Sequence, residues 1–136
     1  MTIVLFACVH NAGRSQMAAA FFNALADPCE ARAASAGTEP ARAVHPEVVQ
    51  AMGEVGMDLS AAHPRRLTPE LVSRATLLVT MGCGEACPFV RGPQREDWDL
   101  RDPKDQPPEG VRAIRDEIRG RVERLITTRG WRARGR

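Results

Sequence analysis

Short apolar runs alternate with amphipathic stretches along this chain of 136 residues. The run at residues 2–8 is continuously apolar and includes β-branched side chains, which is typical of a strand buried on both faces of a parallel sheet. A second run of this kind covers residues 75–81. Weaker patterns predict shorter strands at residues 31–36 and 98–100. Together these segments predict a sheet of about four strands.

Helical patterns lie between these strands. Amphipathic or alanine-rich spacing predicts helices at residues 15–25, 46–55, 69–74 and 108–127. Ser15 and Thr68 are the expected N-caps of the first and third of these helices. Glycines and prolines make residues 82–95 a predicted loop. The alternation of strands and helices indicates the α/β class, as a single-domain, open parallel sheet with helices on both faces.

Composition and charge narrow the possible functions. The net charge of +2 is too small to argue for a nucleic-acid partner. The sequence shows no signal-peptide pattern and no apolar stretch long enough to span a membrane, so we expect a cytoplasmic protein. We expect residues 1–128 to form the domain and the basic residues 129–136 to be a flexible C-terminal tail.

The chain has four cysteines. In a cytoplasmic protein, cysteines are more often catalytic, redox-active or metal-bound than paired in structural disulfides. No cysteines and histidines have the spacing of a zinc site, so no bound metal is predicted. His45 and His63 each precede a proline and are interpreted as turn residues, and Cys29 as structural or free.

The segment CVHNAGRS at residues 8–15 leaves a predicted buried strand and opens a predicted helix. Active sites of α/β sheets lie at this carboxyl edge of the strands. Backbone N–H groups converge in such a loop, and the helix N-terminus adds positive potential, so the loop is suited to a tetrahedral oxyanion. The candidate oxyanion-binding residues are Val9, His10, Asn11, Ala12, Gly13 and Arg14. Arg14 adds a charged, bidentate donor.

Cys8 is the candidate nucleophile of this loop. A helix N-terminus and a nearby cation favour the thiolate form of a cysteine. Ser15 is placed to donate a hydrogen bond to that sulfur or to a leaving group. Asn11 tolerates the positive φ that a tight loop needs, and Gly13 permits close backbone approach. The alternative is that Cys8 is only a buried residue at a strand end, which is common for free cysteine.

Asp102 precedes Pro103, which keeps it out of the helical conformation. A carboxyl group projecting from such a rigid loop near a thiolate can act as a general acid toward an oxygen leaving group. The alternative is ordinary turn chemistry.

Several motifs give the chain a family resemblance. From residue 3 to about residue 125 it resembles the low-molecular-weight protein tyrosine phosphatase family. The matching features are the 8–15 loop, Asp102-Pro103, and the runs RSQMA at 14–18, SAGT at 35–38 and VTM at 79–81. The last three runs look more like the arsenate reductase branch of that family. The resemblance implies that Cys8 is the nucleophile, that residues 9–14 bind the oxyanion and that Asp102 handles the proton.

The substrate expected from this resemblance is arsenate, with phosphate or sulfate as competing anions. The chain contains no tyrosine, and Lys104, Asp105 and Gln106 follow Asp102-Pro103 where phosphatase members usually place aromatic residues. An aryl or tyrosine phosphatase using Cys8, Arg14 and Asp102 remains the alternative enzyme. A non-enzymatic oxyanion-binding module is a third possibility, but a pure binder has no use for a nucleophile.

Cys83 and Cys87 suggest how a reductase would receive electrons. By resemblance to thioredoxin-coupled members, Cys83 attacks the arsenylated Cys8 and Cys87 then attacks Cys83. The sequence departs from that pattern, in which the two later cysteines are farther apart. Here Gly82 also precedes Cys83 as an extra glycine, and Pro88 follows Cys87. The competing route uses an external thiol such as mycothiol with a mycoredoxin-type partner. No bound cofactor is expected on either route.

Overall fold

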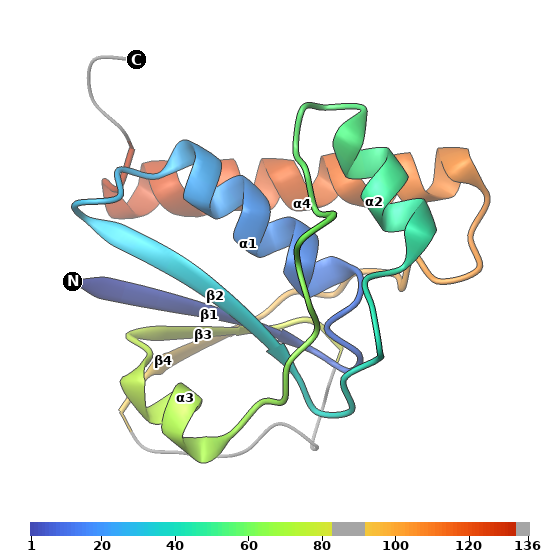
Figure 1. Cartoon of the computed structure of the whole chain (residues 1–136). Helices are drawn as coiled ribbons and strands as arrows, with labels where there is room; N and C mark the ends of the chain where they lie inside the picture. The colour runs from blue at the N-terminus through green and yellow to red at the C-terminus, as the bar shows by residue number, and fades with distance from the viewer. Residues whose placement is uncertain (83–91, 133–136) are drawn as a thin grey trace.

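The chain folds around a four-stranded parallel sheet (Figure 1). The computed structural model describes residues 1–82 and 92–132. Its strands are β1 (Thr2–Cys8), β2 (Ala31–Gly37), β3 (Leu77–Thr80) and β4 (Gln94–Asp97), in the spatial order β2-β1-β3-β4. Cys8 pairs with Gly37, and Ala7 pairs with Thr80, so β1 ends beside the ends of β2 and β3. The predicted α/β class and parallel sheet are confirmed.

Helices cover both faces of the sheet. The helices are α1 (Arg14–Leu25), α2 (Pro46–Gly53), α3 (Pro69–Arg74) and α4 (Pro108–Arg129). α1, α2 and α4 lie on one face and α3 on the other (Figure 1). β1 contributes to both cores, with Val4 and Phe6 facing the larger one and Leu5 the smaller one. This double burial explains why β1 is apolar at consecutive positions.

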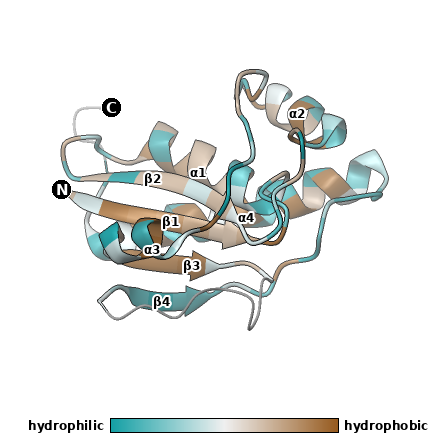
Figure 2. Ribbon diagram, turned by 60° about the horizontal axis from the view of Figure 1, so that its bottom comes forward, coloured by the Kyte–Doolittle hydropathy of each residue, from teal (hydrophilic) through white to brown (hydrophobic). Residues whose placement is uncertain are grey.

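The fourth strand lies at residues 94–97, so its predicted position at residues 98–100 was wrong. Its sequence QRED is polar, as the hydrophilic colour of β4 in Figure 2 shows. β4 is an edge strand whose side chains are mostly exposed, which explains this polarity. The apolar pattern had located Trp98 and Leu100, which are buried just after the strand. Hydropathy therefore identified the segment that enters the core, and missed the backbone that pairs with β3.

The start of α1 and the end of α2 also differ from the prediction. α1 begins at Arg14 with Gly13 as its N-cap, so Ser15 is not the N-cap. The Ser15 hydroxyl makes hydrogen bonds toward the preceding loop instead. Thr68 does cap α3, where its side-chain oxygen accepts a hydrogen bond from the Leu71 N–H at 3.2 Å. α2 ends two residues before the expected boundary, at Gly53.

The C-terminal segment is held on the domain as far as residue 132. Arg129 is the last residue of α4, and its guanidinium lies 3.3 Å from a Glu96 carboxylate oxygen. The Trp131 ring packs edge-on against Phe22, with the ring centroids 5.8 Å apart. The Asp27 N–H donates to the Trp131 carbonyl at 2.7 Å. Residues 129–132, expected in the tail, thus contact the core, and residues 133–136 lie outside the described part. Among the described residues, no helix has the length and apolar character to cross a membrane.

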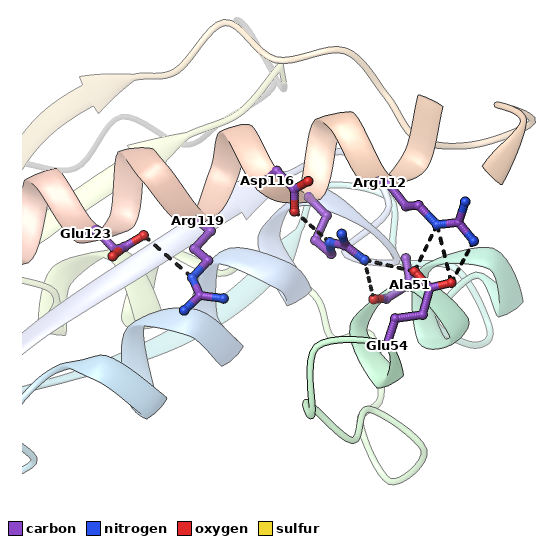
Figure 3. Close-up of polar contacts among 7 residues, drawn as sticks. Ala51, Glu54, Arg112, Asp116, Arg119 and Glu123 are labelled. Atoms are coloured by element: carbon purple, nitrogen blue, oxygen red, sulfur yellow. Dashed lines mark hydrogen bonds and ion pairs between the residues drawn. The ribbon is translucent and has the colours of Figure 1, made fainter. Parts of the chain in front are cut away.

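An ion-pair network joins α2 to α4 (Figure 3). Arg115 of α4 is buried and donates hydrogen bonds to the Ala51 carbonyl at 2.8 Å and to Glu54 at 2.9 Å. Arg112 donates to both carboxylate oxygens of Glu54. These arginines hold the pKa of Glu54 below its usual value of 4.5, with the Arg112 hydrogen bond as the largest cause. The network fixes α2, whose N-terminus follows the segment that contacts the 8–15 loop.

We expect Glu54→Gln to lower the melting temperature at neutral pH. The folded-state pKa of Glu54 lies below its unfolded value, so its contribution is present above pH 4.5 and is lost as pH falls further. The difference between the two proteins should therefore shrink as the pH decreases from 7 to about 3.5. Glu123→Gln, which breaks an exposed pair within α4, is the control and should show a smaller effect. A pH-independent difference in melting temperature for Glu54→Gln would contradict this assignment.

Candidate active site

The 8–15 loop connects the end of β1 to the start of α1 at the carboxyl edge of the sheet. Its carbonyl oxygens point outward and accept hydrogen bonds from the chain around it. The N–H groups of Thr38, Glu39, Ala41 and His45 donate to the carbonyls of Cys8, Val9, His10 and Ala12, respectively, at 2.7–3.2 Å. The residues that follow β2 thus hold the loop from outside.

The loop's N–H groups have no such partners. No N–H of residues 9–14 donates to a protein acceptor among the residues that the structure describes. Because the carbonyls of Cys8, Val9, His10 and Ala12 are held by the surrounding chain, these donors are left for a ligand, and the first turn of α1 adds further unpaired N–H groups. An oxyanion inside the loop could accept hydrogen bonds from these groups, and oxyanion binding by residues 9–14 stays a prediction.

Cys8 lies at the base of this loop and is almost fully buried. Its Sγ is 2.9 Å from the Ser15 Oγ. The Asn11 side-chain amide donates to the same Ser15 oxygen at 2.7 Å. Because the Ser15 oxygen already accepts this hydrogen bond, its hydroxyl proton is available to the Cys8 sulfur. The geometry can thus stabilise negative charge on that sulfur.

Asn11 is the centre of the polar network beneath the loop. It is buried and has a φ of 49°, a left-handed conformation that asparagine tolerates better than most residues. Its Oδ1 accepts hydrogen bonds from the Arg65 N–H at 3.0 Å and from Gln16 Nε2 at 3.2 Å. Gln16 Nε2 also donates to the Asn11 carbonyl and to the His63 carbonyl. These contacts fix the turn and the orientation of Asn11.

Arg14 is the first residue of α1 and is mostly buried. Its Nη1 donates to the Leu100 carbonyl at 3.2 Å. Its Nη2 lies 3.7 Å from Asp102 Oδ2. The guanidinium is therefore held between the loop and the 100–102 segment.

Asp102 reaches the site through its neighbour Pro103. A Cβ on Gly13 would lie 2.7 Å from Pro103 Cγ, so the proline ring packs directly on the glycine. Asp102 itself is 44% exposed, and its Oδ1 accepts a hydrogen bond from the Lys104 N–H at 3.0 Å. The carboxyl group is held at the rim of the loop, where solvent and a bound ligand can reach it.

The structure describes some of the remaining candidate residues and leaves others out. Ala12 is buried in the loop, and Val9 and His10 are half-buried there. Cys29 is exposed, and its N–H donates to Asp27, away from the loop. Cys83 and Cys87 lie outside the described residues. Within residues 1–82 and 92–132, no three His, Cys, Asp or Glu side chains form a group that could hold a metal ion.

Sequence reasoning missed three contributors to the site. Gln16 belongs to the helical run and carries no motif of its own, although its amide supports the loop. Leu100 acts through its backbone carbonyl, which its side-chain type does not reveal. Gly82 was noted as an extra glycine, and its positive φ of 92° and closeness to Arg14 appear only in three dimensions.

We expect Ser15→Ala to weaken both stability and thiol reactivity. The change removes the acceptor of the buried Asn11 amide, which should cost about 1–3 kcal/mol. It also removes the hydroxyl beside the Cys8 sulfur, so alkylation of Cys8 by iodoacetamide at neutral pH should slow. Ser73→Ala is the control, because that exposed hydroxyl donates only to the nearby Glu70 carbonyl. Equal alkylation rates in Ser15→Ala and wild type would contradict the role of Ser15.

Comparisons with known proteins agree with this geometry. The model of the family described as low molecular weight phosphotyrosine protein phosphatase matches residues 3–130. A relative from Halobacterium salinarum, whose name places it provisionally among the arsenate reductases, is 42% identical over 127 residues, 89% of this chain and 88% of the relative. The glutaredoxin arsenate reductase of Synechocystis sp. is 35% identical over 129 residues, 93% of this chain and 97% of that protein.

A solved structure extends the similarity to three dimensions. The thioredoxin-dependent arsenate reductase of Corynebacterium glutamicum superposes with a TM-score of 0.81 and 38% sequence identity. The match covers 94% of this chain and 61% of that structure, so this chain spans less than two thirds of its length. The family model covers nearly all of the 136 residues, and the chain therefore belongs to the low molecular weight phosphotyrosine protein phosphatase family, with arsenate reductases among its relatives.

Proposed function

We propose that this protein reduces arsenate to arsenite. The observation that carries the proposal is the buried Cys8 sulfur, 2.9 Å from the Ser15 hydroxyl, at the base of a loop that offers its N–H groups to an oxyanion. Arsenate is a tetrahedral oxyanion of the size and charge that such a loop binds. The similarity to arsenate reductases over about nine tenths of the chain supports this choice of substrate.

The first step is attack of the Cys8 thiolate on arsenic. The N–H groups of residues 9–14 and the Arg14 guanidinium bind the arsenate oxygens and stabilise the charge that builds on them. Asp102, at the rim of the loop, donates a proton to the departing oxygen, which leaves as water. A Cys8–arsenic bond forms and an arsenic–oxygen bond breaks, with no change in oxidation state.

The second step transfers two electrons. The Cys83 thiolate attacks the Cys8 sulfur, and the sulfur–arsenic electron pair stays on arsenic, which leaves as arsenite. Cys87 then attacks Cys83, which releases Cys8 as a thiolate and leaves a Cys83–Cys87 disulfide. Thiolate attack with exchange of sulfur partners is the ordinary course of thiol–disulfide chemistry. The presence of two cysteines after β3 and the similarity to a thioredoxin-dependent arsenate reductase support this relay.

Thioredoxin is the reductant that we favour for this disulfide. The Corynebacterium glutamicum structure belongs to a thioredoxin-dependent arsenate reductase. Mycothiol with a mycoredoxin-type partner is the alternative, in which the external thiol attacks the arsenylated Cys8 directly. Either route requires a compartment that keeps thiols reduced, so we place the protein in the cytoplasm.

A phosphatase activity is the second candidate. Cys8, Arg14 and Asp102 also form the minimum set for hydrolysis of a phosphate ester, and the family takes its name from phosphotyrosine. The segments around the loop, residues 38–45 and 100–106, contain no phenylalanine, tyrosine or tryptophan to hold a substrate ring. Arsenate is therefore the better fit.

The proposal is tested by arsenite formation with each reducing system. Wild-type protein is assayed with thioredoxin, thioredoxin reductase and NADPH, and separately with mycothiol and mycoredoxin. Turnover with thioredoxin and a Cys83–Cys87 disulfide in a mass map after one turnover support the relay, whereas a mycothiol adduct on Cys8 supports the external route. Folded protein that produces no arsenite in either system, or that hydrolyses phosphotyrosine efficiently, would overturn arsenate reduction as the main activity.

A further inference from the structure

Gly82 lies two residues after the end of β3, against the side chain of Arg14. Its φ is 92°, in the region that side-chain-bearing residues rarely adopt. A Cβ added to Gly82 would lie 2.6 Å from Arg14 Nη1 and 3.4 Å from Arg14 Cζ. The guanidinium of Arg14 therefore lies directly over the α-carbon of Gly82.

The Arg14 guanidinium has two further contacts. Nη1, which would be struck by a Cβ at position 82, is the nitrogen that donates to the Leu100 carbonyl at 3.2 Å. Nη2 lies 3.7 Å from Asp102. A methyl group at position 82 would have to push Nη1 from its place, and the movement would reach both of these contacts.

We propose that Gly82 is a positioning residue for Arg14, which it holds in the place and orientation needed to bind the oxyanion. This inference rests on the proposed oxyanion chemistry of the loop. Gly82 contacts no substrate itself, and it acts by leaving room that any other residue would fill. An arginine side chain is flexible at its tip, so a Cβ at position 82 displaces the guanidinium more readily than it disrupts the fold.

A second glycine allows the displacement of Arg14 to be separated from the backbone strain of a positive φ. Gly56 has a φ of 83°, close to that of Gly82, but a Cβ there would meet no atom within 4 Å. Gly56→Ala therefore carries the cost of the positive φ without the displacement of a side chain. It is a matched control for Gly82→Ala.

The test measures binding of inorganic phosphate by calorimetry to wild type, Gly82→Ala and Gly56→Ala. The two variants should lose similar amounts of thermal stability. We expect Gly82→Ala to raise the Kd for phosphate about 10- to 100-fold, because small displacements of a positioned group have effects of this size. Gly56→Ala should stay within about twofold of wild type. In an Arg14→Lys background, Gly82→Ala should lose most of its effect, because the two residues act together.

A second measurement does not depend on the reaction. The Arg14 side-chain Nε–H resonance of the phosphate-free protein should shift in Gly82→Ala and stay in place in Gly56→Ala. If wild type neither binds phosphate nor reduces arsenate, the proposed function fails, while this resonance still decides the positioning role. An unchanged resonance, or equal loss of phosphate affinity in both variants, would overturn the inference. Should Gly82→Ala not fold, Gly82→Asn keeps a residue that tolerates positive φ while adding the Cβ.

Discussion

Cys8→Ser should abolish arsenate reduction and leave oxyanion binding largely intact. The serine hydroxyl is not ionised at neutral pH and cannot pass electrons to arsenic through a sulfur–arsenic bond. Loss of a nucleophile lowers turnover by about 10⁴- to 10⁶-fold in enzymes where it has been removed. The N–H groups of residues 9–14 and the Arg14 guanidinium remain in place, so phosphate should still bind. Arsenite formation and phosphate calorimetry check the two halves of this prediction.

Cys29→Ser provides the control for Cys8→Ser. Cys29 is an exposed free cysteine whose N–H is fixed by Asp27, away from the loop. Its removal should change turnover by less than about twofold, in line with ordinary surface substitutions. Residual arsenate reduction in Cys8→Ser, or a loss in Cys29→Ser of similar size, would mean that another thiol begins the reaction.

Arg14→Lys should lower kcat/KM for arsenate by about 10²- to 10³-fold, the range seen when one donor of an oxyanion site is removed. Lysine keeps the charge but has a single nitrogen, so it cannot hold two oxygens side by side. It also cannot reproduce the contacts of separate nitrogens with the Leu100 carbonyl and Asp102. We expect both a higher KM and a lower kcat, because the guanidinium binds the ground state and stabilises the charge that develops during attack.

Arg121→Lys is closely matched to this variant. The Arg121 guanidinium also donates to a backbone carbonyl, that of Asp99, and pairs with a carboxylate, that of Glu117. It lies on α4, outside the loop, so the change should leave kcat/KM within about twofold. Similar losses in both variants would show that charge or stability, and not bidentate binding in the loop, explains the effect of Arg14→Lys.

The central part of the fold could be predicted because its physical signals are local. β1 is buried on both faces, and its unbroken apolar run follows directly from that environment. α4 has buried residues at helical spacing, and its C-cap is Gly130, which adopts the left-handed conformation with a φ of 75°. β4 was misplaced because an edge strand of four polar residues gains its stability from backbone pairing with β3, which leaves no hydropathy signal.

The candidate site also has parts that local sequence signals reveal and parts that depend on folding. The shared location of Cys8, Arg14 and Ser15 could be predicted because they belong to one short segment between a strand and a helix. The contacts of Gln16 with the His63 carbonyl, and of Arg14 with the Leu100 carbonyl and Gly82, depend on chain segments that meet only after folding. Asp102 is intermediate, because Asp-Pro suggests a rigid carboxyl group but only the packing of Pro103 on Gly13 brings it to the rim.

The hydrogen bonds that hold the carbonyls of the 8–15 loop from outside have a consequence for when the loop can fold during translation. The loop leaves the ribosome before the residues that hold it, which are spread from Thr38 to Pro103. Domains fold as units during translation. Until Pro103 has been made, the loop lacks part of the packing that holds it. The proposed reactivity of Cys8 toward oxyanions therefore arises only when the domain has folded.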